Sequence, residues 1–301
     1  MATCLFFNIQ VIPVNSKKNG LIGVDGYKKI SEKLAEVTTL KKTDKKLHDY
    51  GVRLKRSEFY MVPINLKPEP NYVRGKLRRY DKVDRLNEFY TNEQLYEVPQ
   101  DKSATTKRSE FDFVFSYENH ILCIENRGGK LPQPTTVEEV LIHFFEDIKS
   151  KFTDFKDYQV TCKVLKEGAA IERLEEAERF GKIEIDISYT NDWRDIEALE
   201  AFIDKESRDS GIAKTKLIQT PAKNGEINQL PNVTKAYLEI ASKNGDAKIR
   251  YFDKFLKKWA NFSFKKFPVK IPVPKKKDEE KAFHIKMFQK IREAMDRTRI
   301  R

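Results

Sequence analysis

Short runs in which apolar and polar residues alternate recur along the chain, as in β-strands that bury one face. The clearest pair spans residues 110–117 and 120–126, and Glu118 and Asn119 separate the two runs, which predicts a β-hairpin. Every second residue of the first run is aromatic. Similar runs occur at residues 3–13, 57–66, 71–80, 158–165, 182–189, 215–220 and 246–252. The chain is therefore expected to be rich in strands.

Between these runs, apolar residues recur every three or four positions, the spacing of amphipathic helices. One helix is expected to begin at Asp25, a residue type that favours the N-cap position. A second is expected to begin at Thr135 or Thr136, because both threonines precede a Glu by three residues, as in a capping box. A last amphipathic helix is expected after Asp278. The apolar residues on its face are Phe283, Met287, Ile291 and Met295.

The order of strands and helices predicts an α+β fold with two mixed α/β domains, in which largely antiparallel sheets are covered by helices. A doubly wound parallel sheet is not expected, because no phosphate-binding loop follows the first strand. The expected parts are residues 1–155, 156–267 and 268–301. The last part is expected to be a basic Pro/Lys arm without regular structure, interrupted by Pro268, Pro272 and Pro274, followed by the amphipathic helix.

The length of 301 residues and the apolar fraction of 39% allow sizeable cores. No apolar run approaches the ~18 residues of a membrane span, and the apolar N-terminus lacks the basic segment of a signal peptide. Cys4, Cys123 and Cys162 each lie inside a strand-like apolar run. Reduced, buried thiols are typical of cytoplasmic proteins, so we expect that location and no membrane span.

The formal net charge of +12 is confined to one end of the chain. Residues 248–301 hold 18 basic and 6 acidic residues, whereas the first 247 residues hold 40 of each. Such a concentration of positive charge predicts a surface for a polyanion such as nucleic acid. A solvated basic tail is the competing interpretation.

Two groups of basic residues are candidates for nucleic-acid contact. The first group is Arg74, Lys76 and Arg78, which share one side of a predicted strand with two tyrosines. Such a face offers charge for phosphates and rings for stacking. Edge strands also carry charges as protection against unwanted pairing, and that alternative stays open.

The second group begins at residues 257–267, where lysines are interleaved with aromatic residues. We expect the rings to be buried in the second sheet and the lysines to form an outer row that continues along the Pro/Lys arm. No base-reading motif is present, so the contact is expected to be with the phosphate backbone. The residues of this group are Lys257, Lys258, Lys265, Lys266, Lys270, Lys275, Lys276, Lys277, Arg297, Arg299 and Arg301.

The sequence contains no P-loop, Rossmann, nucleophile-elbow or zinc-protease signature, so no cofactor or metal is expected. One pair, Asp112 in the first strand of the hairpin and Glu125 at the end of the second, is similar to the metal-binding carboxylates of restriction-type nucleases. Those enzymes carry a lysine two positions after the Glu, where this chain has Arg127, which cannot readily act as a base. Asp112 also alternates with the phenylalanines, as a solvent-facing residue would.

The segments FDFVFSYENHILCIENR, TTVEEVLIHFF, KIEIDISYTND and YLEIASKNGDAKIRYFD, in this order, resemble a bacterial family of about this length. That family is distantly similar to the lambda phage exclusion protein RexA and to KwaB of the Kiwa defence system. The resemblance extends from Asn71 to Asp253 and rests on the order of elements, so no site residue is carried over. It implies a cytoplasmic antiphage protein with two α+β domains that binds double-stranded DNA without sequence preference and is often dimeric.

We therefore expect a non-enzymatic, sequence-independent DNA-binding component of a bacterial phage-defence system. Two alternatives stay open: a metal-dependent nuclease effector that uses Asp112 and Glu125, and a subunit whose last helix docks on a partner protein. The expected partners are double-stranded DNA or another nucleic acid, a second defence protein, and a second copy of the chain.

Overall fold

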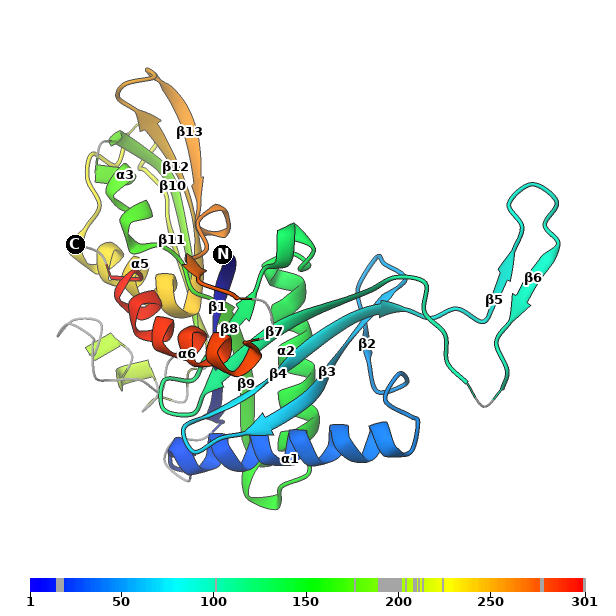
Figure 1. Ribbon diagram of the computed structural model, residues 1–301. Helices are drawn as coiled ribbons and strands as arrows, with labels where there is room; N and C mark the ends of the chain where they lie inside the picture. Colours follow the sequence, from blue (N-terminus) through cyan, green and yellow to red (C-terminus); the bar gives the residue numbers. More distant parts are fainter. Residues whose placement is uncertain are drawn as a thin grey trace.

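The computed structural model describes residues 1–14, 19–100, 102–175, 177–188, 202–203, 205–207, 210, 212, 214–223, 225–276 and 279–299. Two antiparallel sheets, each covered by helices, form the body of the molecule (Figure 1). A two-stranded arm projects from the first sheet. The predicted α+β class with largely antiparallel sheets is therefore confirmed.

The first sheet is built around β1 (Ala2–Pro13), which is long enough to pair with three other strands. One edge of β1 pairs with β8 (Ile121–Glu125). The other edge pairs first with β14 (Lys270–Val273) and then with β9 (Tyr158–Val164). Segments from the start, the middle and the end of the chain thus meet in one sheet.

Beyond β8, the first sheet continues through four further strands in the order β7, β4, β3, β2. The predicted β7–β8 hairpin is confirmed, with Phe113 opposite Ile124. The strands are β7 (Arg108–Ser116), β4 (Tyr72–Asp81), β3 (Phe59–Pro68) and β2 (Val52–Arg53).

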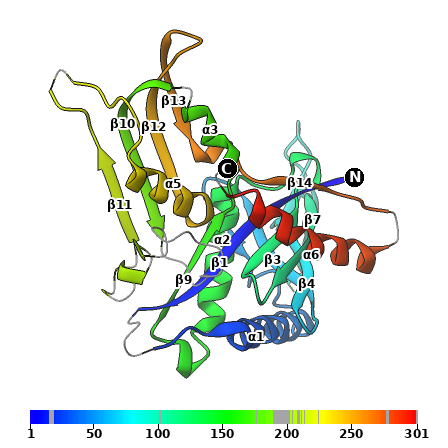
Figure 2. The ribbon, with the colours of Figure 1, turned by 90° about the vertical axis from the view of Figure 1, so that its left-hand side faces the viewer.

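Helices cover both faces of the first sheet. On one face, α1 (Gly23–Thr43) and α2 (Pro134–Lys149) bury the alternating aromatic residues of β7 in the larger core. On the other face, α6 (Glu280–Asp296) packs over β14, β1, β8 and β7 (Figure 2). The two-residue period of β7 thus sends Phe113 toward α2 and Val114 toward α6.

The second sheet has the strand order β11, β10, β12, β13 and is covered on one face by α5. Its core contains the alternating isoleucines of β10, from Ile183 to Ile187, as their spacing predicts. The elements are α3 (Glu172–Glu175), β10 (Ala177–Ser188), β11 (Lys214–Gln219), α5 (Asn232–Asn244), β12 (Gly245–Asp253) and β13 (Lys258–Ser263). Short 3-10 turns lie at Arg127–Gly129, Thr153–Phe155, Gly168–Ala170 and Phe264–Lys266.

The C-terminal segment is not the irregular Pro/Lys arm that the prolines suggested. Lys270–Val273 forms β14, in which Ile271 and Val273 are buried beneath α6. Pro272 is tolerated because β14 is an edge strand that pairs only with β1, and a proline disrupts a sheet mainly at central positions. The first sheet therefore takes strands from all three of the expected parts of the chain.

The predicted C-terminal helix is present, and its apolar face is used within the chain. Phe283, Met287 and Ile291 are buried against the first sheet. The docking alternative placed this helix on a partner protein, and the structure contradicts that role for its apolar face. Asp278, the expected cap, lies outside the described residues.

The two sheets meet through buried polar contacts. The Asn8 side chain donates a hydrogen bond to Asn244 Oδ1 at 2.9 Å. Lys166, fully buried, donates from Nζ to the carbonyl oxygen of Gly245. Ser242 Oγ donates to the carbonyl oxygen of Thr298 at 2.9 Å, which ties the end of α6 to α5.

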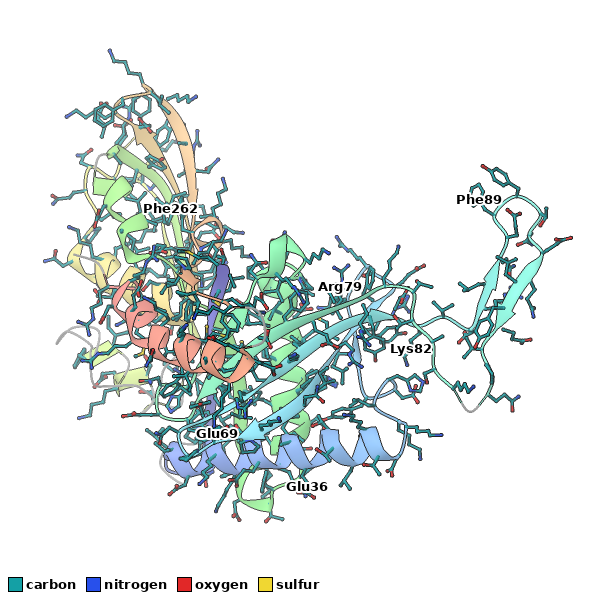
Figure 3. The ribbon with its side chains drawn as sticks, viewed as in Figure 1. Glu36, Glu69, Arg79, Lys82, Phe89 and Phe262 are labelled. Carbon is teal, nitrogen blue, oxygen red and sulfur yellow. The ribbon has the colours of Figure 1, made fainter. Side chains whose placement is uncertain are left out.

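The arm consists of β5 (Arg85–Asn87), β6 (Gln94–Glu97) and the loops that join them to β4 and β7. Its tip carries Phe89, which Figure 3 shows far from the body of the molecule. Phe89 and Tyr90 are each 88% exposed. The sequence did not predict this arm.

Candidate functional site

Asp112 and Glu125 lie next to each other on the face of the first sheet that α6 covers. Asp112 is on β7 and Glu125 ends β8, and the register of the hairpin places the two residues on opposite strands at the same level. Their exposures are only 7% and 4%. The structure thus brings the two carboxylates together, and it buries Asp112 where a solvent-facing position was the alternative.

Lys275 bridges the two carboxylates. Its Nζ donates to Asp112 Oδ2 and to Glu125 Oε2, both at 2.8 Å. Burial by itself would lower the pKa of Lys275, but these hydrogen bonds and the two negative charges raise the pKa above its usual value. Lys275 was predicted to contact nucleic acid, and the structure turns it inward instead.

The first two turns of α6 add two more side chains to this cluster. His284 Nε2 is 3.3 Å from Asp112 Oδ1. Glu280 Oε2 is 3.1 Å from Lys76 Nζ, which in turn is 3.8 Å from Asp112 Oδ1. One ligand-type atom from each of Asp112, Glu280 and His284 lies within 4.8 Å of the other two. We call Lys76, Asp112, Glu125, Lys275, Glu280 and His284 the carboxylate cluster.

Asp112 stays ionised in this setting. Burial by itself would raise its pKa, but the contacts with His284 and Lys275 and the charges of Lys275 and Lys76 hold the pKa well below its usual range. The carboxylate cluster thus keeps a negative charge in a buried place. Two carboxylates with a nearby lysine can hold a divalent cation and polarise a water molecule, which is the chemistry of metal-dependent phosphodiesterases.

Sequence reasoning found two members of this cluster and missed the others. Asp112 and Glu125 share a local hairpin, so their proximity followed from alternation alone. The lysine expected at position 127 comes instead from Lys275, and Arg127 is exposed in a 3-10 turn. The one local signal for the rest was the four-residue spacing of Glu280 and His284, which places both on one face of a helix.

The three predicted basic residues of β4, Arg74, Lys76 and Arg78, are held in ion pairs. Arg74 Nε is 2.9 Å from Glu69 Oε1, and Arg78 Nη2 is 2.8 Å from Glu110 Oε1. Lys76 belongs to the carboxylate cluster. A phosphate would have to compete with these carboxylates, so β4 is less suited to phosphate contact than an unpaired set of cations.

The C-terminal basic residues do not form the single row that was predicted. Arg297 pairs with Glu167 at 2.9 Å, and Lys265 is 3.5 Å from Asp246. Lys276 and Arg299 also lie close to carboxylates, whereas Lys266 and Lys270 are exposed. Lys277 and Arg301 lie outside the described residues. The row breaks up because β14 and α6 fold back on the first sheet.

The hairpin between β12 and β13 keeps its basic residues in solvent. Lys257 and Lys258 are exposed and, among the described residues, have no acidic partner. Phe262 and Phe264 are buried in the second core as expected. Trp259 is not: it lies on the opposite face of the sheet and is 38% exposed.

Aromatic rings and guanidinium groups stack around Trp259. The Arg250 guanidinium carbon is 4.7 Å from the centre of the Trp259 ring, and that of Arg179 is 4.5 Å from the Phe252 ring. At the tip of the hairpin, Phe255 is 74% exposed. We call this region the hairpin surface; its residues are Arg250, Phe252, Lys254, Phe255, Lys257, Lys258 and Trp259.

The structure thus defines a mixed α+β protein with a buried carboxylate cluster on one sheet and an exposed basic and aromatic surface on the other. The chain belongs to the family described as domain of unknown function DUF4747, whose sequence profile matches residues 5–293. A search of curated proteins returned no match. Within the described part of the chain, no helix has the length and apolar character needed to cross a membrane.

Proposed function

We propose that the protein is a non-enzymatic nucleic-acid-binding protein that contacts the phosphate backbone, of double-stranded DNA in the first place, through the hairpin surface. The observation that carries this proposal is the unpaired charge of Lys254, Lys257 and Lys258 at the tip of a projecting hairpin. These cations have no carboxylate partner among the described residues, unlike Arg74, Lys76 and Arg78 of β4.

The composition of the hairpin surface fits a polyanion better than it fits a solvated tail. Lysines that neutralise phosphates release condensed counterions, which favours binding without regard to sequence. Exposed rings such as Trp259 and Phe255 can stack on bases where strands open. Lys258 lies on β13, and Lys254 and Lys257 lie in the short turn that the paired strands β12 and β13 close. The paired strands limit the movement of this turn, so little chain entropy is lost when the lysines bind.

The proposal is tested by reversing charge at the hairpin. Lys257→Glu with Lys258→Glu is expected to lower affinity for a short DNA duplex by at least about tenfold at low salt, because two phosphate contacts are lost and two repulsions are gained. Fluorescence anisotropy with a labelled duplex measures the effect.

A matched variant separates this effect from net charge. Lys28→Glu with Lys29→Glu changes the same number of charges on α1, distant from the hairpin along the chain. Equal losses of affinity in the two variants would contradict a role for the hairpin surface. Deletion of the C-terminal residues is not a suitable test, because β14 and α6 are part of the first sheet and its core.

The place of this activity in phage defence rests on the resemblance of residues 71–253 to a defence family, and it stays a prediction. The cytoplasmic location stays a prediction as well. Plating efficiency of phages on cells with and without the protein tests the first of these. Loss of protection in the hairpin variant would connect the binding to the defence role.

A metal-dependent nuclease is the second candidate, because Asp112, Glu125 and Lys275 come together in space. These are the groups that such enzymes use to hold a cation and polarise water. Cleavage of DNA in the presence of Mg²⁺ or Mn²⁺ that disappears in Glu125→Gln would support this candidate. A wild-type protein that binds DNA and leaves it intact with both ions would exclude it.

Self-association also stays a prediction, and the arm is the place to test it. Phe89 and Tyr90 are exposed at its tip and Leu95 is 67% exposed. A homodimer, as the resemblance implies, should be detected by light scattering after gel filtration. Substitution of Phe89 and Tyr90 by serine would return a monomer if the arm holds the two copies together.

A further inference from the structure

His284 is a buried histidine whose ring nitrogens lack hydrogen bonds. The residue is 1% exposed, and neither nitrogen has a hydrogen-bond partner among the described residues. Nε2 is 3.3 Å from Asp112 Oδ1, but the contact lacks hydrogen-bond geometry, and that oxygen has no other hydrogen-bond partner among the described residues. Buried polar atoms are nearly always satisfied, so this arrangement suggests a missing partner between them.

Glu280 completes a possible set of ligands around this gap. Its carboxylate lies within 4.8 Å of the ligand atoms of Asp112 and His284. Glu280 and His284 are one helical turn apart on α6, whereas Asp112 comes from β7. The three ligands are therefore held by two packed elements, which limits how far they can move apart. One imidazole and two carboxylates suit Mn²⁺, Zn²⁺ and related ions.

The carboxylate cluster combines three carboxyl groups, those of Asp112, Glu125 and Glu280, with two lysines, Lys76 and Lys275. Lys76 contacts both acidic ligands, at 3.1 Å from Glu280 and 3.8 Å from Asp112. Its side chain is 23% exposed, so it can move into solvent.

We propose that Asp112, Glu280 and His284 bind a divalent first-row transition-metal ion, with Mn²⁺ and Zn²⁺ as the representative ions. Binding releases Lys76 to solvent, and Lys275 keeps its hydrogen bonds to the other oxygen of Asp112 and to Glu125. The site does not depend on nucleic-acid binding, because the hairpin surface lies on the other sheet.

The test is a titration of the chelator-treated full-length protein with Mn²⁺, followed by the electron paramagnetic resonance signal of the free ion. We expect one ion per chain and its displacement by Zn²⁺. Glu280→Gln and His284→Asn should each weaken binding by roughly tenfold or more, because each removes a ligand. Glu293→Gln, on the same helix, and His143→Asn, on α2, are matched controls that should leave the affinity unchanged.

The Lys76→Met variant distinguishes a metal-binding site from a cluster of ion pairs that only stabilises the fold. Without the competing ammonium, the affinity for Mn²⁺ should rise by roughly threefold or more. A wild-type protein that binds neither Mn²⁺ nor Zn²⁺, or an affinity that Glu280→Gln leaves unchanged, would overturn the proposal, as would weaker binding by Lys76→Met. Glu280 and Lys76 are partly exposed, so these two variants decide the matter even if His284→Asn does not fold.

Discussion

At the scale of single residues, Lys275 determines whether the carboxylate cluster is stable. Asp112 and Glu125 are both buried, and the Lys275 ammonium is 2.8 Å from each. Removing one partner of a buried ion pair lowers the free energy of unfolding by about 3–5 kcal/mol, far more than an exposed ion pair contributes to it. Lys276, the next residue, is 72% exposed and 3.5 Å from Glu279. The two adjacent lysines therefore have different roles.

We predict that Lys275→Met lowers the free energy of unfolding by about 2 kcal/mol or more, because two buried carboxylates lose their shared cation. Lys276→Met should change it by less than about 0.5 kcal/mol, as for other exposed substitutions. Urea unfolding followed by tryptophan fluorescence measures both. Equal stability of the two variants would show that Lys275 does not hold the cluster together.

Lys166 is a second buried cation, at the contact between the two sheets. Burial lowers the pKa of Lys166 to about 8, against the opposing effect of Glu138 and Asp246. The unfolded chain, with the ordinary lysine pKa, therefore holds its proton over a pH range in which the folded chain has released it. Stability consequently rises as the pH increases from about 8 toward 10.5.

We predict that this rise disappears in Lys166→Met. Between pH 7 and pH 10, the wild type should gain roughly 2 to 3 kcal/mol of unfolding free energy relative to the variant. Comparing the two proteins at each pH cancels the effects of other titrating groups. Parallel curves for the two proteins would contradict a lowered pKa at Lys166.

A site residue could be predicted from the sequence only where its partner lies nearby along the chain. Asp112 and Glu125 were predictable because a hairpin and an alternating pattern place them together. Lys275 and His284 reach them only after β14 pairs with β1 and α6 packs on the sheet. No periodicity in a single sequence encodes that pairing, so the inward turn of Lys275 could not be foreseen.

At the scale of elements, β14 was missed for the same reason: its partner strand β1 lies at the other end of the chain. The prolines were expected to exclude regular structure, and that expectation was wrong for β14, which contains Pro272. A proline excludes a central strand but not an edge strand, which needs hydrogen bonds on one side only. The β7–β8 hairpin and the last helix carried strong periodic signals and were predicted correctly. The β5–β6 arm has short strands with exposed residues, so it has no buried face and leaves no alternating pattern.

Asp81, at the end of β4, fixes the base of this arm. It accepts hydrogen bonds from Thr105 Oγ1 at 2.6 Å and from the backbone N–H groups of Thr106 and Lys107 at 2.9 and 3.0 Å. Burial by itself would raise the pKa of Asp81, but these hydrogen bonds hold the pKa well below its usual range. The carboxylate therefore stabilises the base of the arm at neutral pH, and that contribution is lost as the pH falls below about 4.

We predict that Asp81→Asn speeds amide hydrogen exchange at Thr106 and Lys107, because the amide oxygen accepts hydrogen bonds more weakly than a carboxylate does. Asp84→Asn is the control, since Asp84 is exposed and its backbone carbonyl, not its side chain, accepts the hydrogen bond from Val98. Amide hydrogen exchange at Thr106 and Lys107 should become faster in Asp81→Asn and stay unchanged in Asp84→Asn. Similar exchange in both variants would mean that Asp81 does not anchor the arm.

At the scale of the whole molecule, the net charge of +12 is divided between two uses. Part of the positive charge at the C-terminal end compensates carboxylates, as Lys275 and Arg297 do. The rest stays in solvent, most clearly at the hairpin surface. The confined charge was visible in the sequence, but its division between buried pairs and open surface depends on the fold.

The measurement that tests this account most directly is the salt dependence of duplex DNA binding by the wild type and by Lys257→Glu/Lys258→Glu. For the wild type, the logarithm of the affinity should fall linearly with the logarithm of the salt concentration. The variant should lose roughly 0.9 from the magnitude of that slope for each of the two phosphate contacts removed. An unchanged slope, or no binding by the wild type at low salt, would contradict a phosphate-binding role for the hairpin surface.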